Sequence, residues 1–273
     1  MTFFHTLRRP LLTLSLMLVA TGALAQAQTQ TKPFEPQSGQ AGKDVVWVPT
    51  PQPLVDLMLD MAKVTAQDYV IDLGSGDGRT VITAAKRGAT AVGIEYNPDM
   101  VELSKRNATA QGVTAKATFM KADLFESDFS KATVITMFLL PEINMRLRPK
   151  ILDMKPGTRI VSNAFDMGDW EPDETATTPN CQQWCRAMMW IVPAKADGSW
   201  RLGAGDLKLT QKFQMLSGTL GSTAIANGRL RGDQITFEAG GTQYTGRVNG
   251  DTIQGTSTAQ GKTANWQAAR TRS

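Results

Sequence analysis

One ten-residue stretch, Val70-Ile-Asp-Leu-Gly-Ser-Gly-Asp-Gly-Arg79, constrains the fold of this chain more than any other. A short apolar run leads directly into three glycines at alternate positions, and a helical pattern follows. Because glycine has no Cβ, such a loop can turn sharply and let a ligand approach its backbone. This order predicts a parallel α/β sheet with a ligand site at the carboxyl end of the first strand.

The spacing and charge of the loop favour a cationic ligand over a dinucleotide. The dinucleotide fingerprint requires glycine or alanine where this chain has Arg79. Asp72 and Asp77 make the loop acidic, and a carboxylate ~4 Å from a pyrophosphate would repel it by roughly 1–4 kcal/mol. S-adenosylmethionine carries an ammonium and a sulfonium, which suit such a loop. Glu95 ends the next strand, where an acid can bind two ribose hydroxyls, and Asp123 follows the third, where it can meet an adenine amino group.

From residue 44 to residue 202 the chain alternates short apolar runs with helical stretches, as parallel sheets with crossover helices do. We expect helices over 54–64, 79–87, 98–111 and 142–152, the last bending or breaking near Pro149. We expect strands over 70–73, 91–95, 117–121, 133–139 and 159–163, and a closing hairpin of 188–192 with 200–202.

Residues 1–25 have the features of a cleaved export signal, with Arg8-Arg9, an apolar run and the A-x-A sequence Ala23-Leu-Ala25. The apolar run is shorter than the ~20 residues that span a bilayer. We therefore expect a periplasmic or secreted protein with no membrane span in its mature chain. A retained anchor and a cytoplasmic location are the alternatives. Residues 26–43 are polar and lack periodicity, which predicts a linker.

The composition excludes several kinds of chemistry. His5, the only histidine, lies in the predicted signal, so a mature chain has neither a catalytic histidine nor a histidine metal ligand. Cys181 and Cys185 are too few for a thiolate metal site. In an oxidising compartment they can form a disulfide, with two buried thiols as the alternative. Loss of residues 1–25, with Arg8 and Arg9, lowers the formal net charge from +4 to +2, which gives no reason to expect nucleic acid as a partner.

The C-terminal part of the chain has a different composition. Residues 203–273 are rich in glycine and have no long helical pattern. The segment 228–235 is repeated at 246–253 with an offset of 18 residues. Turn pairs such as Asn-Gly and Gly-Asp separate short apolar runs. We therefore expect a small antiparallel β-meander domain, and a binding or docking role is one alternative to a purely structural one.

The motif Asp72-Leu-Gly-Ser-Gly-Asp-Gly78, together with Glu95 and Ala122-Asp123-Leu124, resembles that of class I S-adenosylmethionine-dependent methyltransferases. Three further segments resemble the protein-lysine methyltransferases of the ATP-synthase c-subunit type: Trp47-Val-Pro-Thr-Pro51, Phe138-Leu-Leu-Pro-Glu-Ile-Asn144 and Asp166-Met-Gly-Asp-Trp170. The resemblance covers residues 44–202, which we expect to be the methyltransferase domain.

The resemblance implies a Rossmann-like seven-stranded sheet with a reversed last strand and S-adenosylmethionine as the cofactor. The residues implied to bind it are Thr50, Asp72, Gly74, Gly76, Gly78, Glu95, Asp123 and Leu124. Leu139-Leu140-Pro141 would face the methyl group near the substrate channel. This segment departs from the Asn/Asp-Pro-Pro-Tyr motif of DNA and RNA amino-methyltransferases, which disfavours nucleobases as acceptors.

We therefore expect in-line methyl transfer to a protein lysine or another amine. Besides Pro141, the candidates to orient the amine are Asn144, Asp166 and the backbone carbonyls around Leu140. No feature of the sequence points to a metal or to a particular oligomeric state. The alternative function is that of an exported, non-catalytic ligand- or protein-binding module on a methyltransferase-like fold.

Overall fold

The computed structural model describes residues 1–3, 34–203 and 205–271, so most of the predicted export signal lies outside the described residues. Residues 34–273 form one compact unit with two sheets. Among the described residues, no helix is long and apolar enough to cross a membrane.

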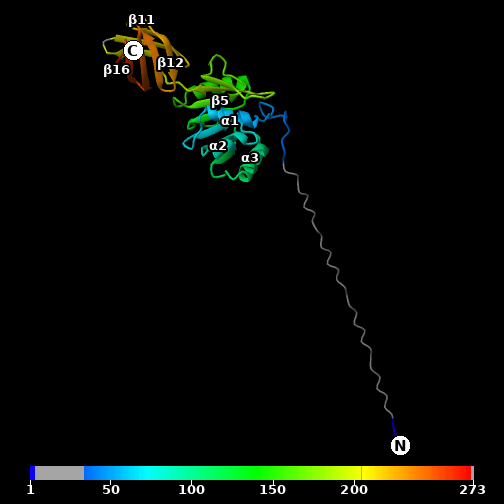
Figure 1. Cartoon of the computed structure of the whole chain (residues 1–273). Coiled ribbons are helices and arrows are strands. Elements are labelled where there is room, and N and C mark those ends of the chain that lie inside the picture. Colours follow the sequence, from blue (N-terminus) through cyan, green and yellow to red (C-terminus); the bar gives the residue numbers. More distant parts are fainter. Residues whose placement is uncertain (4–33, 204, 272–273) are drawn as a thin grey trace. The chain divides into compact units, whose positions relative to one another are not determined.

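The first sheet has seven strands in the order β3-β2-β1-β4-β5-β7-β6. Figure 1 labels one of these strands, β5. Neighbours from β3 to β5 run parallel, and β7 is antiparallel to both β5 and β6. The predicted seven-stranded sheet with one reversed strand is therefore confirmed. Its strands are β1 Tyr69–Leu73, β2 Thr90–Glu95, β3 Ala117–Lys121, β4 Val134–Met137, β5 Arg159–Asn163, β6 Glu174–Thr177 and β7 Arg186–Ile191.

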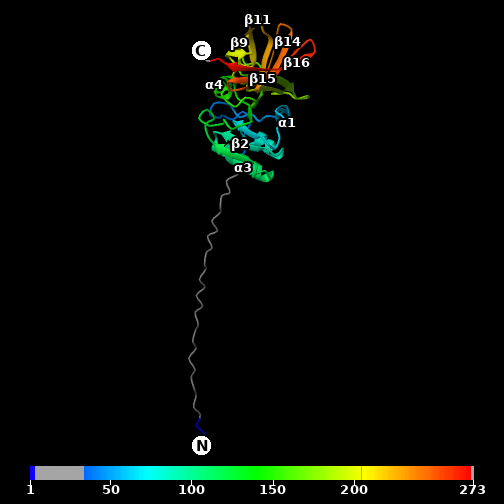
Figure 2. The same cartoon turned by 90° about the vertical axis from the view of Figure 1, so that its left-hand side faces the viewer.

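Helices cover both faces of this sheet, because its strands present apolar side chains on both sides. One apolar cluster joins Val70, Val134 and Val161 to three of the helices, and the other joins Ile71, Ile135 and other strand residues to the fourth. The three helices on the first face are α1 Gln52–Met61, α2 Arg79–Lys86 and α3 Pro98–Ala110, and the fourth is α4 Pro141–Leu152, labelled in Figure 2. Pro149 lies inside α4, which continues to Leu152, so the helix does not break there.

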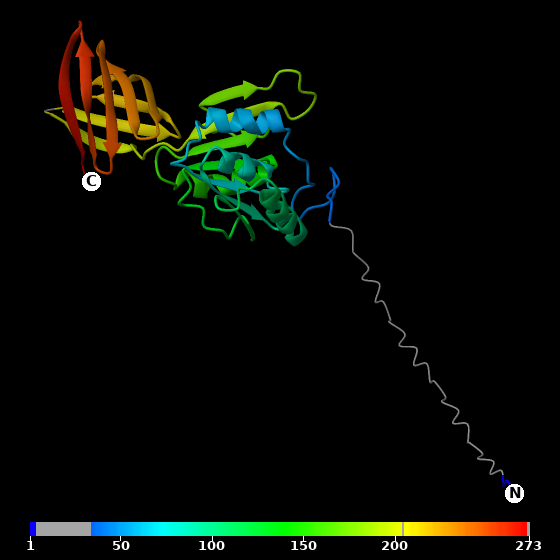
Figure 3. The same cartoon turned by 60° about the horizontal axis from the view of Figure 1, so that its bottom comes forward.

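The second sheet is antiparallel throughout and closes on itself, because β9 pairs with both β8 and β10. Figure 3 shows its strands, coloured yellow to red, curving around a common interior. Side chains such as Trp200, Ile235 and Phe237 fill that interior. The strands are β8 Gly198–Leu202, β9 Gly205–Lys212, β10 Met215–Leu220, β11 Thr223–Ala224, β12 Ala226–Arg231, β13 Gln234–Ala239, β14 Thr242–Asn249, β15 Thr252–Ala259 and β16 Lys262–Arg270.

The repeat in the sequence corresponds to two hairpins of this second sheet. Its first copy spans the turn between β12 and β13, and its second spans the turn between β14 and β15. The closing hairpin predicted from 188–192 and 200–202 is wrong. Both sides of β7 are already paired, with β5 and β6, and β8 pairs with β9 and β16. Trp200 is buried in the second core rather than the first.

The two sheets are connected by an ion pair whose carboxylate is buried and whose arginine side chain is 41% exposed. The side chain of Asp173 is 0% exposed, and its carboxylate accepts hydrogen bonds from Arg229 Nη2 at 2.6 Å and from the Ile191 backbone N–H at 2.8 Å. Replacing Arg229 by Ala should lower the free energy of unfolding by about 1–3 kcal/mol, because the buried carboxylate loses a charged donor. Urea unfolding measures this loss.

Arg231 is a matched control for this prediction. It lies two residues further along β12 and pairs with Glu174 at 2.5 Å, but these side chains are 44% and 42% exposed. Arg231→Ala should cost less than about 1 kcal/mol, because exposed ion pairs contribute little. Equal losses for the two variants would contradict the importance of burial at Asp173.

Candidate functional site

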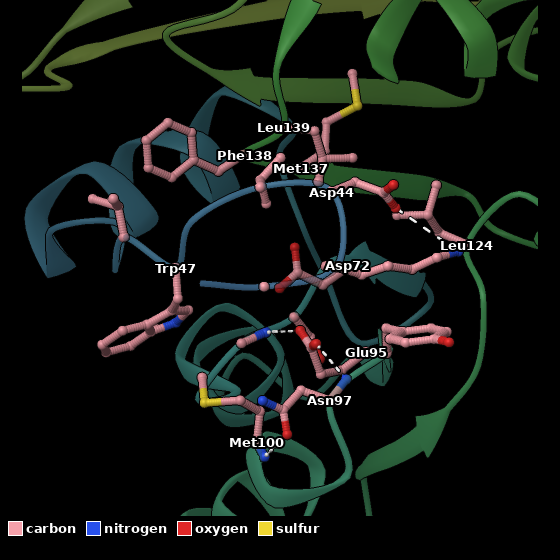
Figure 4. A pocket seen from close by; sticks show the side chains of 18 of the residues that line it. Asp44, Trp47, Asp72, Glu95, Asn97, Met100, Leu124, Met137, Phe138 and Leu139 are labelled. Atoms are coloured by element: carbon pink, nitrogen blue, oxygen red, sulfur yellow. Dashed lines mark hydrogen bonds and ion pairs between the residues drawn. The ribbon is translucent and has the colours of Figure 1, made fainter. Parts of the chain in front are cut away.

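A cavity of about 590 Å³ is lined by residues at the carboxyl ends of β1, β2 and β4. The chain moves from β1 to β2 and β3 on one side and then crosses to β4 on the other, and ligands of α/β sheets bind at such a reversal. Figure 4 shows the carboxylates of Asp72 and Glu95 pointing into this cavity, with Trp47 and Leu139 among the surrounding side chains. The two acids identified from the sequence therefore share one site.

The glycine loop between β1 and α2 is held by backbone hydrogen bonds. The N–H groups of Gly74 and Ser75 both donate to the carbonyl of Ile94, at 2.9 and 3.0 Å. Gly76 N–H donates to Glu95 Oε2 at 3.0 Å, and Asn97 N–H donates to Glu95 Oε1 at 2.9 Å. Glu95 thus orders the loop and still lines the cavity.

Two of these glycines lie where a side chain would not fit. Gly76 has a φ of +53°, and a Cβ there would lie 2.6 Å from the indole nitrogen of Trp47. Gly78 has a φ of +83° and begins α2 as its N-cap. The helix α3 fixes the other side of the loop, since Ser104 Oγ donates to the Gly76 carbonyl at 2.7 Å. Packing within the protein therefore requires glycine at both positions, and the approach of a ligand to this backbone stays a prediction.

Asp72 is a buried carboxyl without a cationic partner. Thr136 Oγ1 donates to it at 2.6 Å. Burial, with smaller effects from the nearby charges of Asp77 and Glu95, raises its pKa to about 7, against the opposing effect of the Thr136 hydrogen bond. Within the part of the chain that the structure describes, no lysine or arginine forms an ion pair with Asp72, whereas Asp77 pairs with Arg79 at 2.6 Å. A cationic ligand would relieve the cost of burying the Asp72 charge.

Asp123 lines the same cavity but is already engaged. It forms an ion pair with Lys43, and its Oδ1 accepts a hydrogen bond from the Phe125 N–H at 2.9 Å. The Lys43 hydrogen bond is the main reason that the pKa of Asp123 is lowered. Residues 40–43 belong to the predicted linker, yet they line the cavity because this ion pair and the backbone pairing of Gln40 with Trp47 hold them there.

Most residues expected to bind the cofactor lie in the cavity wall. Thr50, Leu124, Asp72, Gly74, Gly76, Glu95 and Asp123 line it. Gly78 is not among the lining residues and instead packs against Phe119 and Ser104. The assignment of these residues to cofactor binding stays a prediction.

The three residues predicted to be catalytic are not among the lining residues. Asn144 is 0% exposed, and its Nδ2 donates to the carbonyls of Phe165 and Asp166 at 3.3 and 2.9 Å. Asp166 is exposed and accepts from the Gly168 N–H at 3.1 Å. Pro141 is the first residue of α4. Their roles stay predictions, and these contacts favour Asn144 as a positioning residue for the loop after β5.

Sequence reasoning missed part of the wall. Phe138, Phe165 and Trp184 line the cavity and contact one another. Tyr96 and Met100 line another part of the wall. Sequence alone favours a core or interface position for Trp184 over a role in binding an ammonium group, and the residue is 38% exposed. The available signal was position, because Phe138 directly follows β4 and Phe165 lies two residues after the end of β5. No cluster of metal-ligating side chains occurs among the described residues.

Comparison with known proteins identifies relatives of the first sheet and its helices. Residues 72–174 match a family model described as the ANTKMT methyltransferase domain. A protein-lysine N-methyltransferase of Saccharolobus islandicus is 47% identical over 133 residues, which are 48% of this chain and 83% of that protein.

Two further similarities cover the same region. The human lysine N-methyltransferase of the ATP synthase c-subunit is 38% identical over 105 residues, which are 38% of this chain and 45% of that protein. A crystal structure of an RNA methyltransferase from Salinibacter ruber, in complex with S-adenosyl-L-homocysteine, aligns with a TM-score of 0.52 and 46% identity. It covers 54% of this chain and 95% of that one. All three relatives are methyltransferases by name.

Proposed function

Because the chain belongs to the family of S-adenosylmethionine-dependent methyltransferases that includes the Saccharolobus islandicus protein-lysine N-methyltransferase, we propose that its acceptor is a protein lysine. One observation carries this proposal, the 47% identity to that enzyme over 83% of its length. The name of the Salinibacter ruber structure makes RNA the second candidate. The segment Leu139-Leu140-Pro141 departs from the Asn/Asp-Pro-Pro-Tyr motif of RNA amino-methyltransferases, and the small formal net charge, +4 for the whole chain and +2 without residues 1–25, gives no electrostatic reason to expect RNA.

The residues of the cavity fit S-adenosylmethionine, which supplies an electrophilic methyl group on a sulfonium when it is bound. Asp72 offers a buried carboxylate without a cationic partner. Glu95 offers carboxylate oxygens for ribose hydroxyls, and the loop of Gly74 and Gly76 lets the ligand approach the backbone. These residues hold and align the cofactor, and alignment can supply much of the rate enhancement of a transfer reaction.

Another part of the cavity wall suits an amine that must lose a proton. Leu139, Leu140 and Ile143 line the cavity there. An apolar environment disfavours a charged ammonium and lowers the pKa of a lysine from its ordinary value of about 10.4. The described residues of the wall include no histidine, so we propose that desolvation and positioning, rather than a strong base, prepare the amine.

The raised pKa of Asp72 predicts that cofactor affinity depends on pH. Below about pH 7 the free protein holds a proton on this carboxyl, and a cationic ligand must displace it. The affinity for S-adenosylmethionine should fall by up to about tenfold per pH unit as the pH is lowered from 7 to 5. Between pH 3.8 and about 7 the unfolded chain has lost the Asp72 proton that the folded chain keeps. The free protein therefore becomes less stable as the pH rises through this range. Isothermal titration calorimetry at several pH values measures the affinity.

Asp72→Asn is the control for this dependence, because the amide has a similar size but does not titrate. The variant should bind S-adenosylmethionine weakly and with little change in affinity between pH 5 and 7. A variant that keeps the slope of the unaltered protein would contradict the role of Asp72.

The acceptor is tested with methyl-labelled S-adenosylmethionine and total cell extract. Label recovered in protein, with peptide mass spectrometry showing methylated lysines, would support the proposal. Label recovered in RNA would overturn the lysine assignment while preserving the enzyme class. The Glu95→Ala variant controls for non-enzymatic methylation.

We propose that the protein acts in the periplasm or outside the cell. The signal-like residues 1–25 support this location, and so does the disulfide between Cys181 and Cys185. S-adenosylmethionine is made in the cytosol, so this location requires a supply of exported cofactor. Fractionation of cells, followed by mass spectrometry of the mature N-terminus, tests it. A chain that begins at Gln26 in the exported fraction is expected, and an unprocessed cytosolic chain would contradict it.

A further inference from the structure

Three aromatic side chains form one cluster in the cavity wall. The rings of Phe138 and Phe165 stack with centroids 6.0 Å apart, and Trp184 contacts them at 5.6 and 5.5 Å. All three residues line the cavity, and Trp184 is 38% exposed. We call these three residues the aromatic cluster. It therefore combines a face toward the cavity with access to solvent.

The aromatic cluster lies on a different part of the sheet edge from the acids. Asp72 and Glu95 belong to β1 and β2, whereas Phe138 follows β4, Phe165 follows β5 and Trp184 precedes β7. The strand order places β1 between β2 and β4, so the acids and the cluster lie on opposite sides of the reversal point. A cofactor held at the acids leaves the cluster for the acceptor.

The backbone around the cluster adopts conformations that are rare for residues other than glycine. Trp184 has a φ of +56°, and Ala164, next to Phe165, has a φ of +62°. Such conformations persist where surrounding structure enforces them, and they occur often at ligand sites. Arg186 holds the backbone of Ala164 in this conformation. The Arg186 carbonyl accepts a hydrogen bond from Ala164 N–H at 2.8 Å, and Arg186 Nη2 donates to the Ala164 carbonyl at 3.0 Å.

A covalent constraint holds Trp184. The disulfide between Cys181 and Cys185 closes a five-residue loop that contains this tryptophan. The loop lies between β6 and β7. A short closed loop has few accessible conformations, which favours presentation of the indole at the position where it meets Phe138 and Phe165.

We propose that the aromatic cluster is the acceptor-binding site, that it takes an alkylammonium group, and that the disulfide keeps Trp184 in this site. The proposal rests on the proposed function. Aromatic faces attract ammonium groups electrostatically, and the attraction is strongest for tryptophan. The rings also cover the apolar arm that carries the charge. A lysine arrives with both features, so the cluster favours cationic amines when they dock, and the proton is lost where the amine meets the apolar part of the wall formed by Leu139, Leu140 and Ile143.

The test compares two soluble probes of nearly equal shape, choline and its neutral isostere 3,3-dimethylbutan-1-ol. Their dissociation constants are measured by NMR on the full chain saturated with S-adenosylhomocysteine. Choline should bind about 2- to 30-fold more tightly than the isostere, the range that cation–π attraction gives. Equal affinity of the two probes would overturn the proposal.

Variants test which residues produce the preference for choline over its isostere. Trp184→Ala should abolish the preference for choline, and Trp184→Phe should retain part of it. Gln182→Ala is the matched control, because Gln182 lies in the same loop but does not line the cavity. The combined variant Cys181→Ser and Cys185→Ser should lose most of the preference. An unaltered preference in Trp184→Ala would exclude the indole from the site, and one in the cysteine variant would exclude the disulfide.

A parallel titration with S-adenosylhomocysteine separates this proposal from the proposed function. All of these variants should bind S-adenosylhomocysteine as the unaltered chain does, because none changes the glycine loop or the two acids. If the unaltered chain fails to bind it, the proposed function fails. If it binds but does not distinguish choline from the isostere, only the acceptor site fails.

Discussion

Glu95→Ala should weaken the binding of S-adenosylmethionine by about 10²- to 10⁴-fold. A hydrogen bond to a charged group contributes about 1.5–3 kcal/mol, and the carboxylate can accept from two ribose hydroxyls. The substitution also removes the acceptor of the Gly76 and Asn97 N–H groups, at 3.0 and 2.9 Å, so the loop itself becomes less ordered. Calorimetric titration of the variant measures the loss.

Two further variants separate the causes of this loss. Glu95→Gln keeps one carbonyl acceptor and should lose less affinity than Glu95→Ala. Glu102→Ala removes the same charge from α3, where Glu102 is 61% exposed and pairs with Lys105. It should bind the cofactor as the unaltered protein does. A Glu95→Ala variant with undiminished affinity and a normal unfolding transition would contradict the cofactor site.

The sequence was most informative where local chemistry decides the structure. The helix expected over 98–111 is α3 Pro98–Ala110, and the side chain of Asn97 directly before it accepts hydrogen bonds from the N–H groups of Asp99 and Met100. The strand expected over 91–95 is β2 Thr90–Glu95, because an apolar run between turn residues has few alternatives in a parallel sheet. The acids at the ends of β1 and β2 then follow from topology, since parallel strands bring their carboxyl ends together.

The missed features depend on contacts between distant segments. The strand β6 has an exposed pattern without apolar alternation, so its pairing with β7 leaves no local signal. The strand expected over 133–139 ends at Met137, because Phe138 and Leu139 leave the sheet to line the cavity. The aromatic cluster joins three loops, and no single loop shows its partners in sequence.

The glycine loop shows what the sequence and the packing each contribute. The sequence indicates that the turn needs residues without Cβ, but only the packing shows which neighbours enforce this at each glycine. Gly78 has a φ of +83°, and a Cβ there would lie 2.7 Å from the ring of Phe119 and 2.9 Å from Ser104 Cβ. Both neighbours are buried, so neither can move without disturbing β3 or α3. Gly78 thus sets the distance between α2, β3 and α3, although it does not line the cavity.

Gly78→Ala should therefore lower the free energy of unfolding by about 2–5 kcal/mol. The left-handed backbone costs roughly 1–2 kcal/mol for a residue with a Cβ, and overpacking adds about 1–3 kcal/mol. Gly112→Ala isolates the first cost, because Gly112 has a φ of +68° but no atom within 4 Å of an added Cβ. Urea unfolding of both variants separates the two contributions. Equal losses would show that Phe119 and Ser104 yield without cost, and that backbone conformation alone requires glycine at position 78.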